Sequence, residues 1–319
     1  MITGIHHVAL VVADMDAAER YYCAAAGLRR LSEGAAQSLA ALIDAPAGPP
    51  PASALLAGPN GYLLLLAPQR PLGSHRADDN PINRPGIRHF CVQNHDCAIL
   101  ERVVVGNHGS LIAAPLDLGT GNQYAYARDG EGNIMEIEGL PYALPDLPTW
   151  IGHVAIVTED MDAATGFYSG LFGAELSNRS HVGPGPQFDR MGGLVGARLE
   201  GAWLPVGNMQ IEFWQFHAPS YQGDGATRAQ LDLGYSHITL ETTALEATAE
   251  RLVELGGQLI SGGAESELAR STFATDPEGN VLQLLELGTG SGLPAIAALA
   301  NPAICAMVEA GRAIDKGIG

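Results

Sequence analysis

The sequence predicts an α+β protein built from four modules of the order βαβββ, because the chain repeats itself and is rich in turn residues. The segment 7–22 returns at 153–168, and the segment 86–92 returns at 234–240. Repetition at this length indicates that one structural unit has been copied along the chain. The 40 glycines and 20 prolines indicate many turns, which is typical of a protein with short strands.

Each module is predicted to start with an apolar strand that carries a histidine. These histidines are His7, His89, His153 and His237. A helix follows each strand. In the first and third modules it is predicted to start after Asp14 or Asp160, because an aspartate side chain accepts a hydrogen bond from a free N–H of the first helical turn. Alternating strands then complete each unit, so the modules begin near residues 4, 86, 150 and 234.

The modules fall into two predicted domains joined by a proline-bearing linker at 141–148. The domains are residues 1–141, with modules near 4–70 and 86–140, and residues 149–290, with modules near 150–217 and 234–287. Residues 291–319 are predicted to form a helical tail. The tail places apolar residues roughly on one helix face, which suits packing on the other half or in a homo-oligomer; they are Ile296, Leu299, Ile304 and Met307.

The charge of the chain argues against nucleic acid and membrane partners. Lys and Arg number 17 against 35 Asp and Glu, a net charge of −18, and no basic run interrupts this balance. Nucleic acids and anionic membranes both require a cationic patch. No apolar stretch is long enough to span a bilayer, and residues 1–12 do not resemble a secretory signal. The four cysteines show no paired spacing, which is typical of reduced thiols in a cytoplasmic protein.

Two motifs resemble those of the vicinal oxygen chelate superfamily. They are a histidine on the first strand of each module, followed by Val in two of the four, and the segment Asp-x-x-Gly-Asn-x-x-Glu at 129–136, which recurs with Gln in the last position at 276–283. That family includes glyoxalase I, methylmalonyl-CoA epimerase, bleomycin-binding proteins and extradiol ring-cleaving dioxygenases. The resemblance covers about residues 4–290. It implies two tandem glyoxalase-like domains, each with paired modules forming a U-shaped mixed sheet around a divalent metal that binds a small oxygenated substrate.

The resemblance also implies one set of metal ligands in each half. In the first half the set is His7, His89 and Glu136, with the apolar Leu64 near the fourth position. In the second half the set is His153, Glu212, His237 and Gln283.

The first set favours an extradiol-type dioxygenase. Two imidazoles and one carboxylate hold Fe(II) on one face and leave several positions open for a substrate and dioxygen. In extradiol dioxygenases a tyrosine that contacts the catecholate lies ten residues before the ligating glutamate. Tyr126 stands in that position before Glu136. We therefore expect a catechol-like substrate, with Tyr126 as the catalytic residue.

The second set supports an alternative, an isomerase or lyase of the glyoxalase and epimerase type. Four protein ligands leave two open positions on an octahedral Zn, Mn, Co or Ni ion, which suits polarisation of a carbonyl and an enolate stabilised by the metal. Asp189 and Glu200 are candidate bases. A further alternative is a drug-binding protein of the bleomycin-resistance type, which would bind its ligand without metal catalysis.

The sequence leaves open which modules share a sheet. If the first and fourth modules pair, His7 and His237 come together and both predicted sites dissolve.

Overall fold

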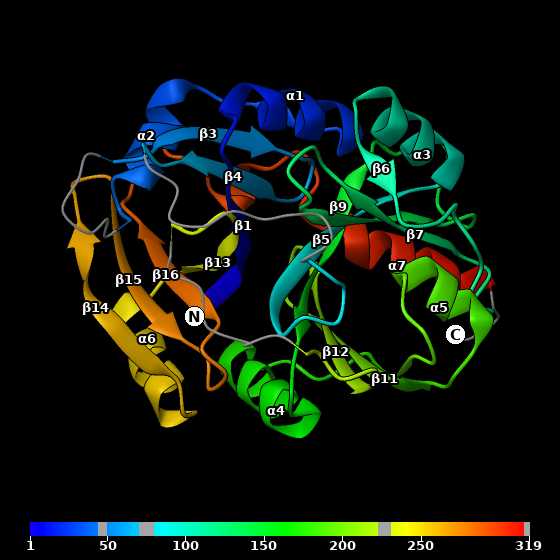
Figure 1. Ribbon diagram of the computed structural model, residues 1–319. Helices are drawn as coiled ribbons and strands as arrows, with labels where there is room; N and C mark the ends of the chain where they lie inside the picture. Colours follow the sequence, from blue (N-terminus) through cyan, green and yellow to red (C-terminus); the bar gives the residue numbers. More distant parts are fainter. Residues whose placement is uncertain (44–49, 70–79, 223–230, 316–319) are drawn as a thin grey trace.

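The computed structural model describes residues 1–43, 50–69, 80–222 and 231–315, which form two mixed eight-stranded sheets lying side by side (Figure 1). Sheet A contains, in spatial order, β14 (Gln258–Glu265), β15 (Ala269–Thr275), β16 (Val281–Leu287), β13 (Gly234–Thr242), β1 (Ile2–Val11), β4 (Tyr62–Ala67), β3 (Ala52–Ala57) and β2 (Arg29–Arg30). Sheet B contains β10 (Asn178–Val182), β11 (Arg198–Pro205), β12 (Gln210–Ala218), β9 (Trp150–Val157), β5 (Gly86–Asn94), β8 (Ile134–Gly139), β7 (Gln123–Arg128) and β6 (Ser110–Leu111).

The α+β class and the modular repeat are confirmed, but the predicted pairing of modules within each half is wrong. β1 pairs antiparallel with β13, so the first module shares sheet A with the fourth. β5 pairs antiparallel with β9, so the second module shares sheet B with the third. Each predicted domain therefore contributes one module to each sheet. In every module, the strand that carries the histidine has one edge whose backbone groups are not bonded within the module. Any other histidine-bearing strand of similar length can pair with that edge, so the local sequence does not determine which two modules share a sheet.

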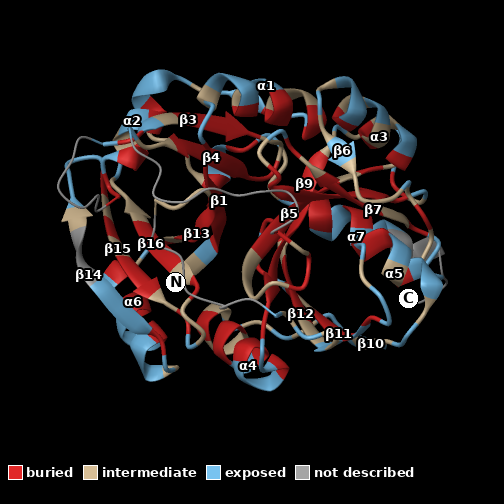
Figure 2. Cartoon of the chain, viewed as in Figure 1, coloured by how far each residue is buried: buried red, intermediate tan, exposed pale blue. Residues whose placement is uncertain are grey.

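Four helices cover the outer faces of the sheets. They are α1 (Met15–Ala25), α3 (Cys97–Gly106), α4 (Met161–Phe172) and α6 (Leu245–Glu254). In Figure 1, α1 lies beside α3 at the top, and α4 lies beside α6 at the bottom. The predicted helix starts are confirmed: Asp14 and Asp160 accept hydrogen bonds from the N–H groups of Ala17 and Ala163 at 2.9 and 3.0 Å. The apolar faces of these four helices join both sheets in one continuous core, whose residues are among the buried ones coloured red in Figure 2.

The inner faces, opposite these helices, are filled differently. On sheet A, α2 (Glu33–Ala40) packs its Leu39 into an apolar layer with Leu64 and Phe273, and Phe273 also meets the buried His237 edge-on. On sheet B the shorter α5 (Pro186–Gly192) packs Phe188 and Met191 against Tyr126 and Trp214. The two sheets thus share a plan but differ in the chemistry of their inner faces.

The tail after the last repeat is helical and packs on its own chain. It contains the short 3-10 turn η2 (Ile296–Ala298) and the helix α7 (Ile304–Asp315). Ile296 and Leu299 pack into the inner layer of sheet A, whereas Ile304 joins the core shared by both sheets. Met307 remains 45% exposed, so the predicted apolar face is not buried as one surface. Among the described residues, no helix has the length and hydropathy needed to cross a membrane.

Candidate metal centre

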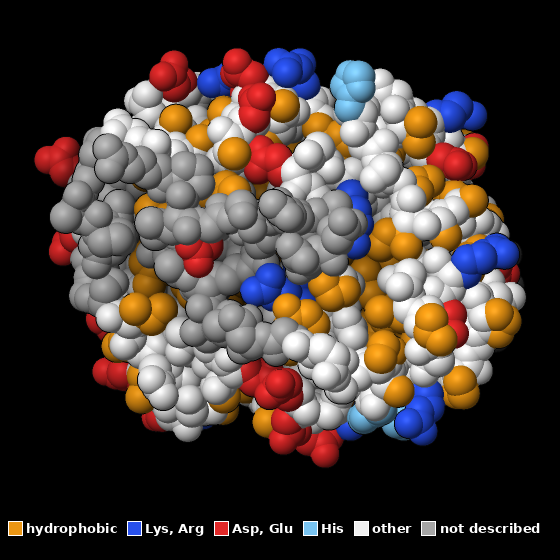
Figure 3. All heavy atoms as spheres, in the orientation of Figure 1, with side chains coloured by type: hydrophobic (Ala, Val, Ile, Leu, Met, Phe, Trp, Pro, Cys, Tyr) orange, Lys and Arg blue, Asp and Glu red, His pale blue; other side chains and the backbone are white. Residues whose placement is uncertain are grey.

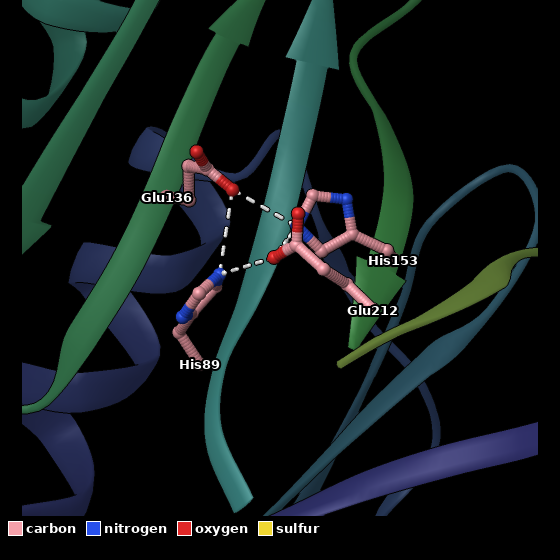
Figure 4. A group of neighbouring side chains, drawn as sticks. All are labelled: His89, Glu136, His153 and Glu212. Carbon is pink, nitrogen blue, oxygen red and sulfur yellow. Dashed lines mark hydrogen bonds and ion pairs between the residues drawn. The ribbon is translucent and has the colours of Figure 1, made fainter. Parts of the chain in front are cut away.

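Four side chains from four neighbouring strands converge on the inner face of sheet B. The strands β8, β5, β9 and β12 are consecutive in the sheet and supply, in that order, Glu136, His89, His153 and Glu212. Because alternate residues of a strand point to one face, one side chain per strand reaches a common centre. Figure 4 shows all four polar ends pointing toward one another.

The distances within this four-residue group are short and even. His153 Nε2 lies 2.9 Å from Glu136 Oε2 and 3.1 Å from Glu212 Oε2. His89 Nε2 lies 3.3 and 3.5 Å from the same two oxygens. Ligand atoms about 2.1 Å from an ion, and at right angles to one another, stand about 3 Å apart. The spacing of the four atoms therefore matches the edges of a coordination shell.

The chemistry of the donors fits a divalent cation as well. Both ring nitrogens of His89 and Oε2 of Glu212 are buried without a hydrogen-bond partner in the described part of the chain. Buried polar atoms are normally paired, and a pair of buried carboxylates requires compensating positive charge. A divalent ion between the four residues would bind His89 Nε2 and Glu212 Oε2 together, so the residues present fit a metal.

The protein environment shifts the pKa values of this group toward the charged forms. Burial alone would raise the pKa of Glu212, but the imidazoles of His153 and His89 outweigh it and hold that pKa well below its usual range. The pKa of Glu136 is also lowered, because its contacts with the imidazoles of His153 and His89 outweigh its burial. Burial lowers the pKa of His153, yet Glu212, Cys91 and Glu136 together raise it well above its usual value. The site thus favours two carboxylates next to positive charge.

A second polar layer lies behind the four-residue group on the same face. Glu138 accepts hydrogen bonds from Gln93 Nε2 at 2.6 Å and from Asn122 Nδ2 at 2.9 Å. Burial, together with the charge of Glu136, raises the pKa of Glu138 to about 7. Cys91, Glu138 and His153 form a second cluster whose ligand-type atoms lie within 4.8 Å of one another. Burial raises the pKa of the Cys91 thiol well above its usual value.

Aromatic side chains form the walls beside the group. Tyr126 stands opposite Glu136 in the strand register, and its ring meets that of His89 edge-on at 5.2 Å between centroids. Trp203 donates its Nε1–H to Glu212 Oε1 at 3.0 Å. Figure 3 shows hydrophobic side chains gathered over the part of the molecule where sheet B lies. The group therefore lies in apolar surroundings, which strengthen its electrostatic interactions.

The predicted grouping of ligands by half is wrong, because the modules pair across the halves. His89 and Glu136 of the first predicted set meet His153 and Glu212 of the second. The remaining predicted ligands, His7, His237 and Gln283, lie on sheet A with Leu64.

On sheet A, both ring nitrogens of His7 have partners within the protein, whereas His237 is bonded through Nδ1 to Ser236 and its Nε2 has no hydrogen-bond partner among the described residues. His7 Nε2 lies 3.0 Å from Thr239 Oγ1, and its Nδ1 lies 2.7 Å from Nδ1 of His6. Leu64 and Gln283 stand where sheet B has Glu212 and Glu136. Neither of those residues brings a negative charge to compensate a cation, so sheet A lacks the donor chemistry of sheet B.

The two candidate bases have structural partners. Asp189 accepts hydrogen bonds from the N–H groups of Gly196 and Ala197, both at 2.7 Å. Glu200 is paired with Arg179, which also reaches Asp162 at the start of α4. Both carboxylates therefore stabilise local structure outside the four-residue group.

A signal for the true grouping is present in the sequence. Carboxylates occupy ligand positions in the second and third modules, as Glu136 and Glu212, whereas the first and fourth carry Leu64 and Gln283. Pairing the second module with the third is the arrangement that collects both carboxylates with two histidines. The ligand chemistry, rather than the repeat itself, indicates which modules meet.

The chain belongs to the Glyoxalase/Bleomycin resistance protein/Dioxygenase superfamily, whose family model matches residues 4–137 and 150–284. The fold is similar to that of glyoxalase I from Zea mays, with a TM-score of 0.63 and 17% identity over 90% of this chain and 93% of that chain. It is also similar to a putative dioxygenase from Bacillus subtilis, with a TM-score of 0.58 and 12% identity over 97% of this chain and 96% of that chain. A comparison with curated protein sequences found no match. At these identities the structural likeness shows the fold alone.

Proposed function

We propose that the chain is a divalent-metal-dependent isomerase or lyase that acts on a small oxygenated substrate bound at the four-residue group of sheet B. The observation that carries this proposal is the set of two imidazoles and two carboxylates supplied by four adjacent strands. Four protein ligands leave two positions on an octahedral ion, which is enough for one substrate bound through two oxygens. Zn, Mn, Co and Ni all suit this mixed nitrogen and oxygen set.

The bound ion supplies Lewis-acid polarisation of a substrate carbonyl. The residues of the chain then have separate tasks. Trp203 anchors Glu212 through its indole N–H, and we assign the uptake of the proton from the carbon next to the carbonyl to the oxygen of Glu136 that does not face the histidines, which leaves the electron pair on the substrate as an enolate. Tyr126, beside His89, is assigned to contact the substrate. The apolar walls keep bulk water away from the reacting carbon.

The Fe(II) dioxygenase expected from the sequence fits this geometry less well. Its predicted three-ligand set includes His7, which lies on sheet A, and places no second carboxylate at the metal. With Glu212 added, the protein fills four positions, and the two that remain cannot hold a bidentate catecholate and dioxygen together. Tyr126 beside His89 is the feature that this alternative retains.

Metal content per chain after anaerobic purification tests the location of the site. We expect about one divalent ion per chain in the wild type, and its loss in Glu136→Ala and in Glu212→Ala. Gln283→Ala and His7→Ala, at the equivalent positions of sheet A, are the matched controls and should keep the ion. Loss of the ion from the sheet A variants, or its absence from the wild type, would contradict the proposed site, and a metal-free wild type would favour the drug-binding alternative.

The reaction class is tested by isotope exchange. We expect the loaded protein to exchange the proton next to the carbonyl of α-hydroxy carbonyl compounds for deuterium in D₂O, followed by NMR, and to lose this in Glu136→Gln. Oxygen uptake that depends on a catechol and on bound iron would instead establish the dioxygenase.

A further inference from the structure

Cys91 lies directly behind the metal-binding group and has no role in the function proposed above. It follows His89 by two residues on β5, so the two side chains share the inner face of sheet B. In the strand register Cys91 stands opposite His153 on β9 and opposite Glu136 on β8. The residue is fully buried.

The contacts of Cys91 connect His153 to an anchored carboxylate. Cys91 Sγ lies within 4.8 Å of a ring nitrogen of His153 and 4.0 Å from Glu138 Oε2. Glu138 is itself held by Gln93 and Asn122, and Trp150 Nε1 donates to Gln93 Oε1 at 2.7 Å. The sulfur therefore sits between a metal-facing histidine and a carboxylate whose position is fixed.

The orientation of His153 shows what this contact would do. Its Nε2 faces Glu136 and Glu212, whereas its other ring nitrogen points away from them (Figure 4). A neutral imidazole that binds a metal through Nε2 must carry its proton on Nδ1. A histidine ligand normally donates that proton to a neighbouring acceptor, which fixes the tautomer and the ring plane.

Sheet A provides an internal comparison for this position. Thr239 occupies the place of Cys91 in the repeat and stands opposite His7, as Cys91 stands opposite His153. Thr239 Oγ1 lies 3.0 Å from His7 Nε2 and donates a hydrogen bond to Gln283 Oε1 at 2.8 Å. A side chain that can both donate and accept thus faces the histidine of the neighbouring strand in both sheets, although Thr239 contacts Nε2 of His7 and sheet A lacks the carboxylates of a metal site.

We propose that Cys91 is a positioning residue, which accepts the N–H of His153 on sulfur and donates its own S–H to Glu138, so that His153 presents Nε2 to the metal. This inference rests on the metal site of the proposed function. It assigns the thiol a place outside the coordination shell, where it acts through His153 and does not touch the ion. Outer partners of this kind change metal affinity about 10-fold to 100-fold.

The test titrates Co(II) into the metal-free full-length protein and follows the visible and near-ultraviolet absorption. We expect Cys91→Ala to weaken Co(II) binding about 10-fold or more, because His153 loses the partner that orients it. Cys91→Ser and Cys91→Thr, which keep a donor and acceptor as Thr239 does, should retain most of the affinity. Cys97→Ala, a buried cysteine at the start of α3, is the matched control and should bind like the wild type.

The absorption spectrum separates positioning from direct ligation. We expect the wild type to lack an intense thiolate-to-cobalt charge-transfer band, and Cys91→Ser to show the same visible spectrum. An intense band that disappears in Cys91→Ser would make Cys91 a ligand and overturn the proposal. Equal Co(II) affinities in the wild type and Cys91→Ala would also overturn it and would leave the proposed function intact. A folded wild type that binds no Co(II) would overturn both.

If Cys91→Ala does not fold, Cys91→Val supplies a second variant of similar volume without a donor or acceptor. Its affinity is compared with that of Cys91→Thr, which has nearly the same shape and restores the hydroxyl. Weak Co(II) binding by Cys91→Val together with restored binding by Cys91→Thr supports the proposal. Equal Co(II) affinities of the two variants contradict it.

Discussion

Asn60 and Asn208 bind each other reciprocally where the two sheets meet. Asn60 Nδ2 donates to the backbone carbonyl of Asn208 at 2.8 Å, and Asn208 Nδ2 donates to that of Asn60 at 2.6 Å. Each side-chain oxygen also accepts a hydrogen bond from a backbone N–H of the opposite sheet. Asn60 accepts from Ile151 on β9, and Asn208 accepts from Ile5 on β1. The pair occupies equivalent turns of the repeat and is fully or nearly fully buried. It therefore fixes the sheets relative to one another about an internal pseudo-twofold axis.

Asn60→Ala should destabilise the protein by about 2 kcal/mol or more, because it leaves several buried backbone groups without partners. Urea unfolding measures the change. Asn107→Ala, which removes an amide bonded to the Val103 carbonyl within one helix, is the control and should cost about 1 kcal/mol or less. If Asn60→Ala lowers the free energy of unfolding no more than Asn107→Ala does, the structural role of the Asn60–Asn208 pair is contradicted.

Metal removal should lower the melting temperature, because it leaves Glu136 and Glu212 as two buried carboxylates in close contact with the same histidines. A ligand that binds the folded state at 100 times its Kd stabilises it by about 2.7 kcal/mol. We expect a melting temperature that rises with added divalent ion and falls with chelator, as measured by calorimetry. In Glu136→Gln/Glu212→Gln this dependence should vanish, and its persistence there would place the ion elsewhere.

Tyr126→Phe should lower kcat/KM about tenfold while leaving the metal content unchanged, because the variant removes the hydroxyl assigned to the substrate and keeps the ring that meets His89 edge-on. Turnover and metal content are measured on the same preparation. Tyr124→Phe, whose hydroxyl is hydrogen bonded to Thr120 at 2.8 Å, is the matched control and should remain active. Equal activity of the two variants would assign Tyr126 to packing.

The buried histidines of sheet A should make the protein less stable in acid. Burial lowers the pKa of His237 to about 3, below the value of 6.5 expected for an unfolded chain. The unfolded state therefore binds a proton that the folded state does not, and stability falls as the pH drops from about 6.5 toward 3, by roughly 1.4 kcal/mol per unit well below 6.5. Urea unfolding measures the free energy of unfolding at pH 7 and at pH 5. The loss of this free energy between pH 7 and pH 5 should be smaller in His237→Leu than in the wild type.

His217→Leu is the control for this effect, since His217 is exposed on β12 and its replacement should leave the pH dependence of the wild type. Identical pH dependence in His237→Leu and the wild type would show that His237 is not the group that takes up the proton.

The modules could be predicted from the amino-acid sequence, because their signals are local. The strand histidines, the helix caps at Asp14 and Asp160 and the turn at 129–133 all act within a few residues, and each recurs in the repeat. All four members of the metal-binding group were also named from the sequence, since the resemblance to the vicinal oxygen chelate superfamily implies ligands on the first and last strands of each module.

Tertiary structure decided which modules meet. A free strand edge carries backbone groups that are the same in every module, so hydrogen bonding at the edge does not distinguish β9 from β1 as the partner of β5. The choice depends on contacts between residues far apart in the chain: the reciprocal bonds of Asn60 and Asn208, and the balance of two carboxylates by two histidines at Glu136, Glu212, His89 and His153. These contacts exist only once the sheets have formed, so the family resemblance predicted the ligands but not how they group.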